Sequence, residues 1–173
     1  SFYKNKKELV FGSQINKDTS IEMPTSWDLF KPVIVPMLDS LFTRLGIGNW
    51  EERILRLQFN LIPKDAEVKP HVDIGFYSMN AHRIHIPIFS SKCIVFSQQK
   101  DEEWQEVPFK EGEAFEINNK IRHRVEQHGP YNRVTMIIDY MDRKCSSFAQ
   151  LEKNLIDGDI KETLDVRDWR GEL

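Results

Sequence analysis

The sequence contains no apolar run that approaches the roughly 20 residues needed to span a membrane as a helix. Its polar beginning, SFYKNKKELVFGS, also lacks the apolar segment of a signal peptide, so we expect a soluble, cytoplasmic protein. Acidic and basic residues nearly balance, at 27 against 24, for a formal net charge of −3. This balance provides no overall field to hold nucleic acid or an anionic membrane, so any binding specificity must be local.

Cysteine is also scarce. Cys93 and Cys145 lack the paired spacing of a zinc knuckle and the density of a secreted disulfide scaffold. Internal repeats and low-complexity tracts are absent, and proline and glycine are scattered between periodic segments. The 173 residues, of which 40% are hydrophobic, suffice for one sizeable core, and we expect a single domain over residues 1–173.

The hydrophobic period changes along the chain. Apolar residues follow a helical stripe in KPVIVPMLDSLFTRLG, which predicts a helix at about 33–45 that Pro36 interrupts or delays and Gly46 ends. The stripe consists of Val33, Met37, Leu38, Leu41, Phe42 and Leu45. From Arg53 the period becomes two, which indicates a strand with one polar face. Further strands are predicted at 82–88, 92–98, 103–108, 113–117, 122–127 and 132–140.

Short strands linked by turns, with no helices between them, favour an antiparallel sandwich. We therefore expect a mainly β protein with flanking helices, built as a sandwich or jelly roll. The expected parts are a helical N-terminal part at about 1–50, a jelly-roll core at about 51–141 and a helical tail at about 146–173.

The stretch VKPHVDIGFY places His71 and Asp73 one residue apart. By itself such a pair is most often a solvated surface feature. A second histidine, His123, follows in a later predicted strand, and two histidines with one aspartate could converge on one metal ion. This facial triad leaves open coordination positions and is characteristic of non-haem Fe(II) oxygenases.

Arginine accompanies the histidines at two places. Arg133 begins the strand after His123, and a hairpin around Gly129-Pro130 could fold it back beside that histidine. Its planar fork would suit the far carboxylate of the 2-oxo acid that such oxygenases consume, although an arginine there is more often a solvated edge residue. In HRIHIPI, Arg83 and His85 share a face that would line a pocket, or alternatively the exposed face of a half-buried sheet.

With these motifs in view, residues 53–140 resemble the aspartyl/asparaginyl β-hydroxylase family of Fe(II)- and 2-oxoglutarate-dependent dioxygenases. The resemblance is carried by FNLIPKDAEVKPHVDIGFY, HRIHIPI, EGEAFEINNKIRHRVEQ and NRVTMIIDY. It implies a cupin-like jelly roll, or double-stranded β-helix, that binds Fe(II), 2-oxoglutarate and O₂. It also implies hydroxylation of an amino-acid side chain, peptidyl or free, with release of succinate and CO₂. His71 and His123 match the histidine ligands, and Arg133 matches the arginine that holds the distal carboxylate of 2-oxoglutarate. Further matches to the co-substrate pocket are Arg83, His85 and Asn60.

Asp73 departs from part of this family, because vertebrate aspartyl hydroxylases carry glycine at that position. The sequence is therefore also similar to bacterial free-proline hydroxylases, which keep the carboxylate. An iron halogenase needs the carboxylate position vacant for halide, so the presence of Asp73 argues against halogenation.

Other classes stay open. A cupin-like isomerase or a non-enzymatic metal-binding jelly roll could share the triad, yet neither has a reason to place Arg133 beyond the distal histidine. A pure interaction module would use its tryptophans as contact residues, although a buried core explains them equally well. These tryptophans are Trp27, Trp50, Trp104 and Trp169. Candidates for substrate recognition are Arg56, Gln58, Tyr77 and Asn80, whereas His82 and His128 receive no role.

Overall fold

A computed structural model of the chain describes residues 7–11, 27–64, 66–74 and 81–141. In chain order its elements are β1 (Lys7–Phe11), α1 (Trp27–Arg44), the 3-10 turn η1 (Trp50–Glu52), β2 (Ile54–Ile62), β3 (Val68–His71), β4 (His82–Phe89), β5 (Ile94–Lys100), β6 (Glu103–Val107), β7 (Phe115–Ile117), β8 (His123–Gln127) and β9 (Arg133–Tyr140). No described helix combines the length and the apolar character needed to cross a membrane.

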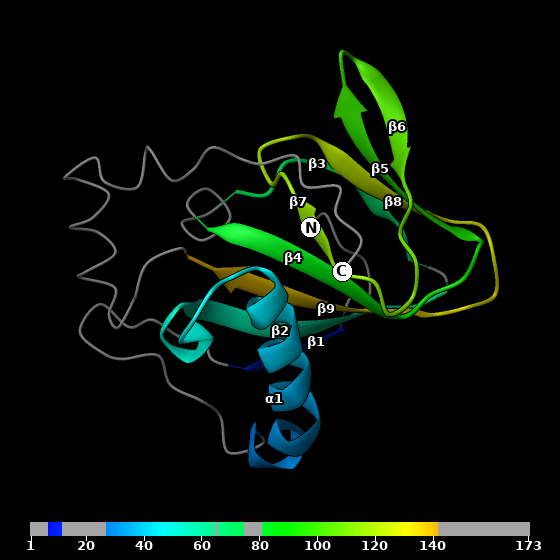
Figure 1. Cartoon of the computed structure of the whole chain (residues 1–173). Coiled ribbons are helices and arrows are strands. Elements are labelled where there is room, and N and C mark those ends of the chain that lie inside the picture. The colour runs from blue at the N-terminus through cyan, green and yellow to red at the C-terminus, as the bar shows by residue number, and fades with distance from the viewer. Residues whose placement is uncertain (1–6, 12–26, 65, 75–80, 142–173) are drawn as a thin grey trace.

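The described strands form two antiparallel sheets. One has five strands in the order β1-β2-β9-β4-β7, and the other has four in the order β3-β8-β5-β6. Figure 1 shows α1 on one side of the five-stranded sheet and the four-stranded sheet on the other. The chain thus crosses repeatedly between the sheets, and the mainly β, jelly-roll architecture expected from the sequence is confirmed.

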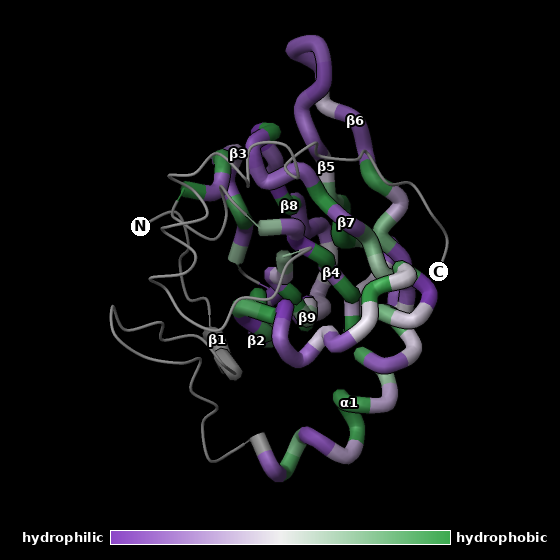
Figure 2. The backbone as a smooth tube through the Cα atoms, turned by 60° about the vertical axis from the view of Figure 1, so that its left-hand side comes forward, coloured by the Kyte–Doolittle hydropathy of each residue, from purple (hydrophilic) through white to green (hydrophobic). Residues whose placement is uncertain are grey.

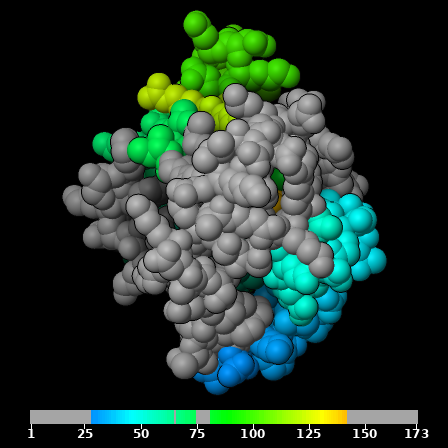
Figure 3. All heavy atoms as spheres, turned by 90° about the vertical axis from the view of Figure 1, so that its left-hand side faces the viewer, coloured from blue at the N-terminus to red at the C-terminus, as the bar shows by residue number. Residues whose placement is uncertain are grey.

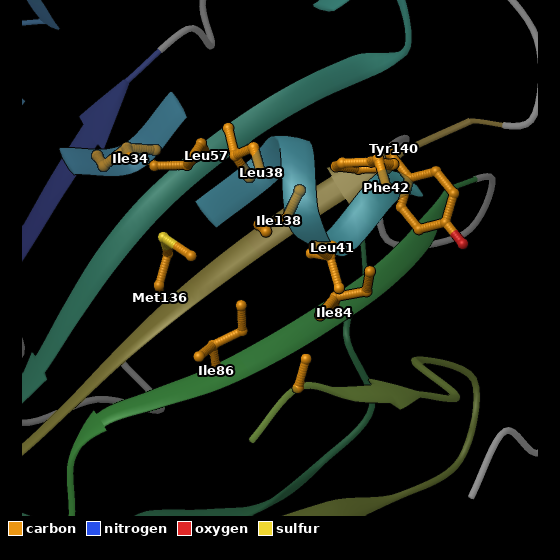
Figure 4. Packing of buried hydrophobic residues seen from close by; sticks show 11 residues of the cluster. Ile34, Leu38, Leu41, Phe42, Leu57, Ile84, Ile86, Met136, Ile138 and Tyr140 are labelled. Carbon is orange, nitrogen blue, oxygen red and sulfur yellow. The ribbon is translucent and has the colours of Figure 1, made fainter. Parts of the chain in front are cut away.

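The five-stranded sheet buries both of its faces. Apart from a bulge in β2 and another in β4, side chains of β2, β4 and β9 alternate between the two faces, so their apolar residues on one side meet α1 and form the main core (Figure 4). This core contains Ile34, Leu38, Leu41 and Phe42 of α1, packed against Leu57, Ile84, Ile86, Met136, Ile138 and Tyr140 of the sheet. The residues between them in sequence point toward the other sheet, and these inward side chains are mostly polar.

Helix α1 begins six residues earlier than the predicted helix and runs through both prolines. Pro32 and Pro36 lie on its exposed side, where water can bond the carbonyl groups that each proline leaves without a partner. The predicted stripe was wrong at Val33, which is 75% exposed, because the helix presents Ile34 to the sheet instead. The end at Gly46 is confirmed, since its positive φ of 70° closes the final turn with Ile47 N–H bonded to the Phe42 carbonyl at 2.9 Å.

The predicted hairpin around Gly129-Pro130 was wrong. Strand β8 belongs to the four-stranded sheet and β9 to the five-stranded sheet, so this connection passes from one sheet to the other. As a result Arg133 faces the sheet that carries His123 and does not lie next to it in a hairpin. The connection itself is tight, because Gly129 lies against Cys93, where an added Cβ would come within 2.7 Å of the Cys93 Cβ.

The other strand predictions are confirmed to within a few residues, whereas β1 was not expected and β3 was expected only as the start of a strand. The predicted helical tail at 146–173, Cys145 and Trp169 lie outside the described residues. Trp50 stacks on Phe42 with ring centroids 6.2 Å apart, and Trp104 stacks beneath Arg124 at 4.3 Å. These two tryptophans therefore already have contacts within the fold.

The hairpin of β5 and β6 projects from the body of the molecule and is hydrophilic at its tip (Figure 2). In the space-filling view it lies at the opposite end of the molecule from α1 and η1 (Figure 3). A cavity of ligand size lies between the sheets, where their inner faces meet.

Candidate functional site

His71, Asp73 and His123 converge at one end of the space between the sheets. His71 ends β3 and His123 begins β8, and the two are register partners in this antiparallel pair. Their rings lie 4.4 Å apart between centroids. His71 Nε2 lies 3.4 Å from Asp73 Oδ1, and His123 Nε2 lies 3.7 Å from Asp73 Oδ2. One nitrogen or oxygen from each residue lies within 4.8 Å of the others, which is close enough for all three to hold a metal ion.

The backbone fixes which ring nitrogen of each histidine faces this point. His71 Nδ1 lies 2.8 Å from the Lys69 carbonyl oxygen, and His123 Nδ1 lies 3.0 Å from that of Ile121. A carbonyl only accepts, so each Nδ1 carries hydrogen, and in the neutral ring Nε2 keeps its lone pair. Two such nitrogens and a carboxylate converge favourably only around a proton or a cation. The donor set therefore fits a divalent metal ion.

Electrostatics keep Asp73 ionised. Burial alone would raise its pKa, but the interaction with His71 and the positive charge of Arg83 hold that pKa well below its usual range. The Arg83 Nη1 group donates a short hydrogen bond to Asp73 Oδ2. For His123, burial is the largest influence and lowers the pKa of the ring, which favours the neutral form that binds metal.

The inner face of the five-stranded sheet forms the floor of the site. Its residues are arranged in rows across β2, β9 and β4, because directly paired residues point the same way. Arg56, Asp139 and Arg83 form the first row and Gln58, Ile137 and His85 the second; Asn60 pairs with Thr135 in the third row, and Ile62 with Arg133 in the fourth. Together with His71, Asp73 and His123, the residues of these rows other than Asp139 line a cavity of about 200 Å³.

Arg133 lies deep in this cavity with 2% of its surface exposed. Its guanidinium lies 4.8 Å from the Phe109 ring centre and 5.9 Å from that of Phe96, and no described carboxylate forms an ion pair with it. Burial lowers the pKa of Arg133 to about 10, so the group still carries its charge at neutral pH. A buried cation without a carboxylate partner is costly, and an anionic ligand would supply that partner.

Among the described residues, other buried polar atoms around Arg133 also have no hydrogen-bond partner. They are both ring nitrogens of His85, Thr135 Oγ1, Gln58 Oε1 and Arg133 Nε itself. All of these residues line the same cavity. Buried polar atoms in folded proteins are nearly always satisfied, so this group fits a polar ligand or water in the cavity.

The structure brings together every predicted site residue except those it does not describe. Arg83, His85 and Asn60 line the cavity, and so do Arg56 and Gln58. Asn60 Oδ1 accepts a hydrogen bond from Gln58 Nε2 at 2.5 Å. Tyr77 and Asn80 lie outside the described residues.

The two remaining histidines lie elsewhere. His82 pairs with Glu116 at 2.5 Å and stacks on Tyr140 at a centroid distance of 5.0 Å. His128 is exposed. Neither histidine lines the cavity, which agrees with the absence of a role for them in the sequence analysis.

Sequence reasoning missed Asp139 and Thr135. Asp139 is completely buried and accepts hydrogen bonds from Arg83 Nε at 2.6 Å and Arg56 Nε at 2.8 Å. A signal was available, because residues at every second position after Arg133 share its face, and an aspartate in an otherwise apolar strand needs a charged partner. The partners themselves come from β2 and β4, and the sequence does not show that pairing.

Comparisons with known proteins extend this picture. A search of curated proteins gave no match to this sequence. Among solved structures, the fold is similar to an oxidoreductase of the 2OG-Fe(II) oxygenase family from Burkholderia pseudomallei, at a TM-score of 0.62 and 13% identity, covering 83% of this chain and 71% of that one. A prolyl-4-hydroxylase from Pseudomonas putida gives a TM-score of 0.45 at 13% identity, covering 80% of this chain and 73% of that one.

The sequence itself decides the family. The model of the aspartyl/asparaginyl beta-hydroxylase family matches residues 31–143, a range that contains α1 from Lys31 onward, both sheets except β1, and every residue of the candidate site. This chain belongs to the aspartyl/asparaginyl β-hydroxylase family.

Proposed function

We propose that this chain is an Fe(II)- and 2-oxoglutarate-dependent hydroxylase that acts on an amino-acid side chain. One observation carries the proposal. A single cavity has the His71, Asp73 and His123 cluster at one end, and it also contains a buried arginine that no described carboxylate pairs with. A metal ion and a dicarboxylate together would satisfy both features. The family match and the description of the Burkholderia neighbour support the same chemistry.

In this proposal His71, Asp73 and His123 hold ferrous iron through two imidazole nitrogens and one carboxylate oxygen. Three protein donors leave coordination positions open toward the cavity. Hydroxylation of a C–H bond by O₂, with conversion of 2-oxoglutarate to succinate and CO₂, is the chemistry that iron supplies in such a site. The Lys69 and Ile121 carbonyls keep both rings turned toward the cavity.

Arg133 would bind the distal carboxylate of 2-oxoglutarate. The rings of Phe96 and Phe109 flank its guanidinium and exclude water, which strengthens a charge-assisted pair. Thr135 Oγ1, two residues along the same strand face, and the ring of His85 offer further polar contacts to the same ligand. Because burial and two neighbouring arginines hold the pKa of His85 well below its usual value, His85 stays neutral and can donate a hydrogen bond without adding charge.

The substrate would be an amino acid or a peptide that enters next to the metal. Arg56 and Gln58 line the cavity on β2, and the exposed Ile74, which follows Asp73, lines it as well. Whether the substrate is free or peptidyl can be determined by measuring succinate release in the presence of free amino acids and of short peptides containing Asp or Asn.

The decisive experiment is a titration of 2-oxoglutarate into the anaerobic Fe(II) protein, followed by the metal-to-ligand charge-transfer absorption. Arg133→Ala removes the partner of a buried anion, at a cost of about 2–5 kcal/mol, which corresponds to roughly ten- to thousand-fold weaker binding of 2-oxoglutarate. Arg133→Lys should restore only part of the affinity, because lysine lacks the planar fork. Iron affinity should stay within about two-fold, because Arg133 is not among the metal donors.

Arg124→Ala is the matched control. Arg124 is half-buried against Trp104 and does not line the cavity, so this variant should bind 2-oxoglutarate as the unaltered chain does. Equal binding by the unaltered chain and Arg133→Ala would remove Arg133 from the co-substrate site. If iron binds but 2-oxoglutarate does not, the proposal fails and a non-oxygenase, cupin-like metal protein replaces it.

A further inference from the structure

Asp139 lies at the centre of a buried row of charges that ends at the candidate metal cluster. Its side chain is 0% exposed, and it is flanked by Arg56 on β2 and Arg83 on β4, its register partners in the sheet. Arg83 donates from Nε to Oδ1 at 2.6 Å and from Nη2 to Oδ2 at 2.9 Å, a two-point fork. Arg56 donates from Nε at 2.8 Å and approaches with Nη2 at 2.6 Å.

One carboxylate between two guanidinium groups leaves a positive charge that needs a second anion. Asp73 supplies this anion, because Arg83 Nη1 donates to Asp73 Oδ2. Only 5% of the Arg83 side chain and 15% of the Asp73 side chain are exposed, so water can replace little of this pairing. The row therefore runs without a break from Arg56 through Asp139 and Arg83 to Asp73.

The fork between Arg83 and Asp139 determines where the third nitrogen of Arg83 points. A guanidinium is planar and rigid, so fixing Nε and Nη2 on one carboxylate also fixes the direction of Nη1. That direction leads to Asp73 Oδ2, which leaves Asp73 Oδ1 turned toward His71 Nε2 at 3.4 Å. Arg83 is thus engaged by two carboxylates, whereas the family resemblance implied that it contacts the co-substrate.

We infer that Asp139 is a positioning residue of the metal centre: through Arg83 it orients the Asp73 carboxylate so that Oδ1 faces His71 Nε2. This inference rests on the metal site proposed above. A carboxylate that binds metal is itself held by hydrogen bonds from surrounding groups, and loss of such a partner typically weakens metal binding about 10- to 100-fold. Asp139 does not line the cavity, and of the two arginines that it holds, Arg83 donates to Asp73, so we expect the effect of Asp139 on the metal to pass through Arg83.

The test measures Mn²⁺ binding, without 2-oxoglutarate or turnover, from the loss of the free-ion EPR signal. Mn²⁺ replaces Fe²⁺ because it does not oxidise in air. Asp139→Asn and Arg83→Met should each raise the Kd for Mn²⁺ about 10- to 100-fold. The double variant Arg83→Met/Asp139→Asn should bind as weakly as Arg83→Met alone, because two residues acting in series do not add. Arg83→Lys keeps the charge but not the fork and should recover only part of the affinity.

A purely structural role for Asp139 predicts a different pattern of Mn²⁺ affinities. A control variant at another buried ion pair tests this alternative. Glu116→Gln breaks the buried pair of Glu116 with His82, which lies outside the cavity. It should lower the thermal midpoint and leave the Kd for Mn²⁺ within about two-fold. Co²⁺ absorption provides a second readout, because a reoriented Asp73 carboxylate should change the ligand-field bands in Asp139→Asn and Arg83→Met but not in Glu116→Gln.

Asp139→Asn leaves two buried guanidinium groups around a neutral amide and could fail to fold. If Asp139→Asn does not fold, the comparison of Arg83→Met with Arg83→Met/Asp139→Asn tests the inference, because the double variant removes one cation together with the anion. A double variant that binds Mn²⁺ ten-fold more weakly than Arg83→Met would overturn the inference, as would unchanged Mn²⁺ affinity in Arg83→Met. If the unaltered chain binds no Mn²⁺, the metal site and this inference fail together.

Discussion

His85 is buried beside Arg83 and Arg133 at the bottom of the cavity. Burial is the main reason that its pKa lies well below the usual value, and the two guanidinium charges lower that pKa further. The folded protein therefore resists placing a third positive charge here. This resistance keeps the floor of the cavity at a fixed charge over the physiological pH range.

The lowered pKa of His85 also makes the free energy of unfolding depend on pH. In the unfolded chain His85 binds a proton as the pH falls below about 6.5, whereas in the folded protein it does not. The stabilisation is therefore complete above that pH and is lost below it, by up to about 1.4 kcal/mol per pH unit for one group. His123 acts in the same direction, because burial lowers its pKa as well.

Urea unfolding of the metal-free protein between pH 7.5 and 5.5 measures this slope. His85→Gln should make the free energy of unfolding fall less steeply with acidification, by up to one proton. The exposed His128 provides the matched control, and His128→Gln should keep the slope of the unaltered chain. Identical slopes for His85→Gln and the unaltered chain would show that His85 titrates alike in both states.

At the scale of elements, α1 packs against the face of the five-stranded sheet that points away from the cavity. Leu38 and Phe42 are 0% exposed against Met136 and Ile138 of β9, which are also 0% exposed (Figure 4). Strand β9 therefore carries the main core on one face and the polar floor of the cavity on the other. Packing of α1 fixes the strand whose opposite face positions Arg133 and Asp139.

Leu38→Ala should lower the free energy of unfolding by about 2–5 kcal/mol, because it removes a fully buried side chain and leaves a cavity. Val33→Ala, on the same helix but 75% exposed, should change it by less than about 0.5 kcal/mol. Chemical denaturation of the metal-free protein measures both. Similar losses in the two variants would mean that α1 does not pack through Leu38.

At the scale of the whole molecule, the candidate metal site connects the two sheets. His71 and His123 come from the four-stranded sheet, whereas Arg83, which bonds Asp73, comes from the five-stranded sheet. A metal ion at this point would hold β3, Asp73 and β8 together, and the hydrogen bond from Arg83 to Asp73 connects this cluster to the five-stranded sheet. Metal binding should therefore stabilise the fold as a whole.

We expect Mn²⁺ at 100 times its Kd to stabilise the protein by about 2.7 kcal/mol, which corresponds to a rise in Tm of about 5–10 °C. His123→Ala should abolish this rise, because it removes a donor from β8. His128→Ala should keep the rise, since His128 does not line the cavity. Differential scanning fluorimetry with and without Mn²⁺ measures the effect, and an equal rise in His123→Ala would place the metal elsewhere.

The jelly-roll class, most of the strands and most of the polar residues that line the cavity could be predicted from the sequence. Alternation with period two is a local property, so it placed Arg83 and His85 on one face. Arg133 was placed by the family resemblance and by a hairpin that the structure does not contain. The spacing of His71 and Asp73 is equally local. The roles of these residues in binding remain predictions, which the experiments above address.

Only the tertiary structure decided which strands meet. The partners of Asp139, the crossing from β8 to β9 between the sheets, and the start of α1 ahead of Pro32 all depend on contacts between residues far apart in sequence. A buried carboxylate, for example, is stable only because β2 and β4 place an arginine on each side of it. The sequence by itself determined which face of each strand is polar, and the pairing of the strands determined what that polar face can bind.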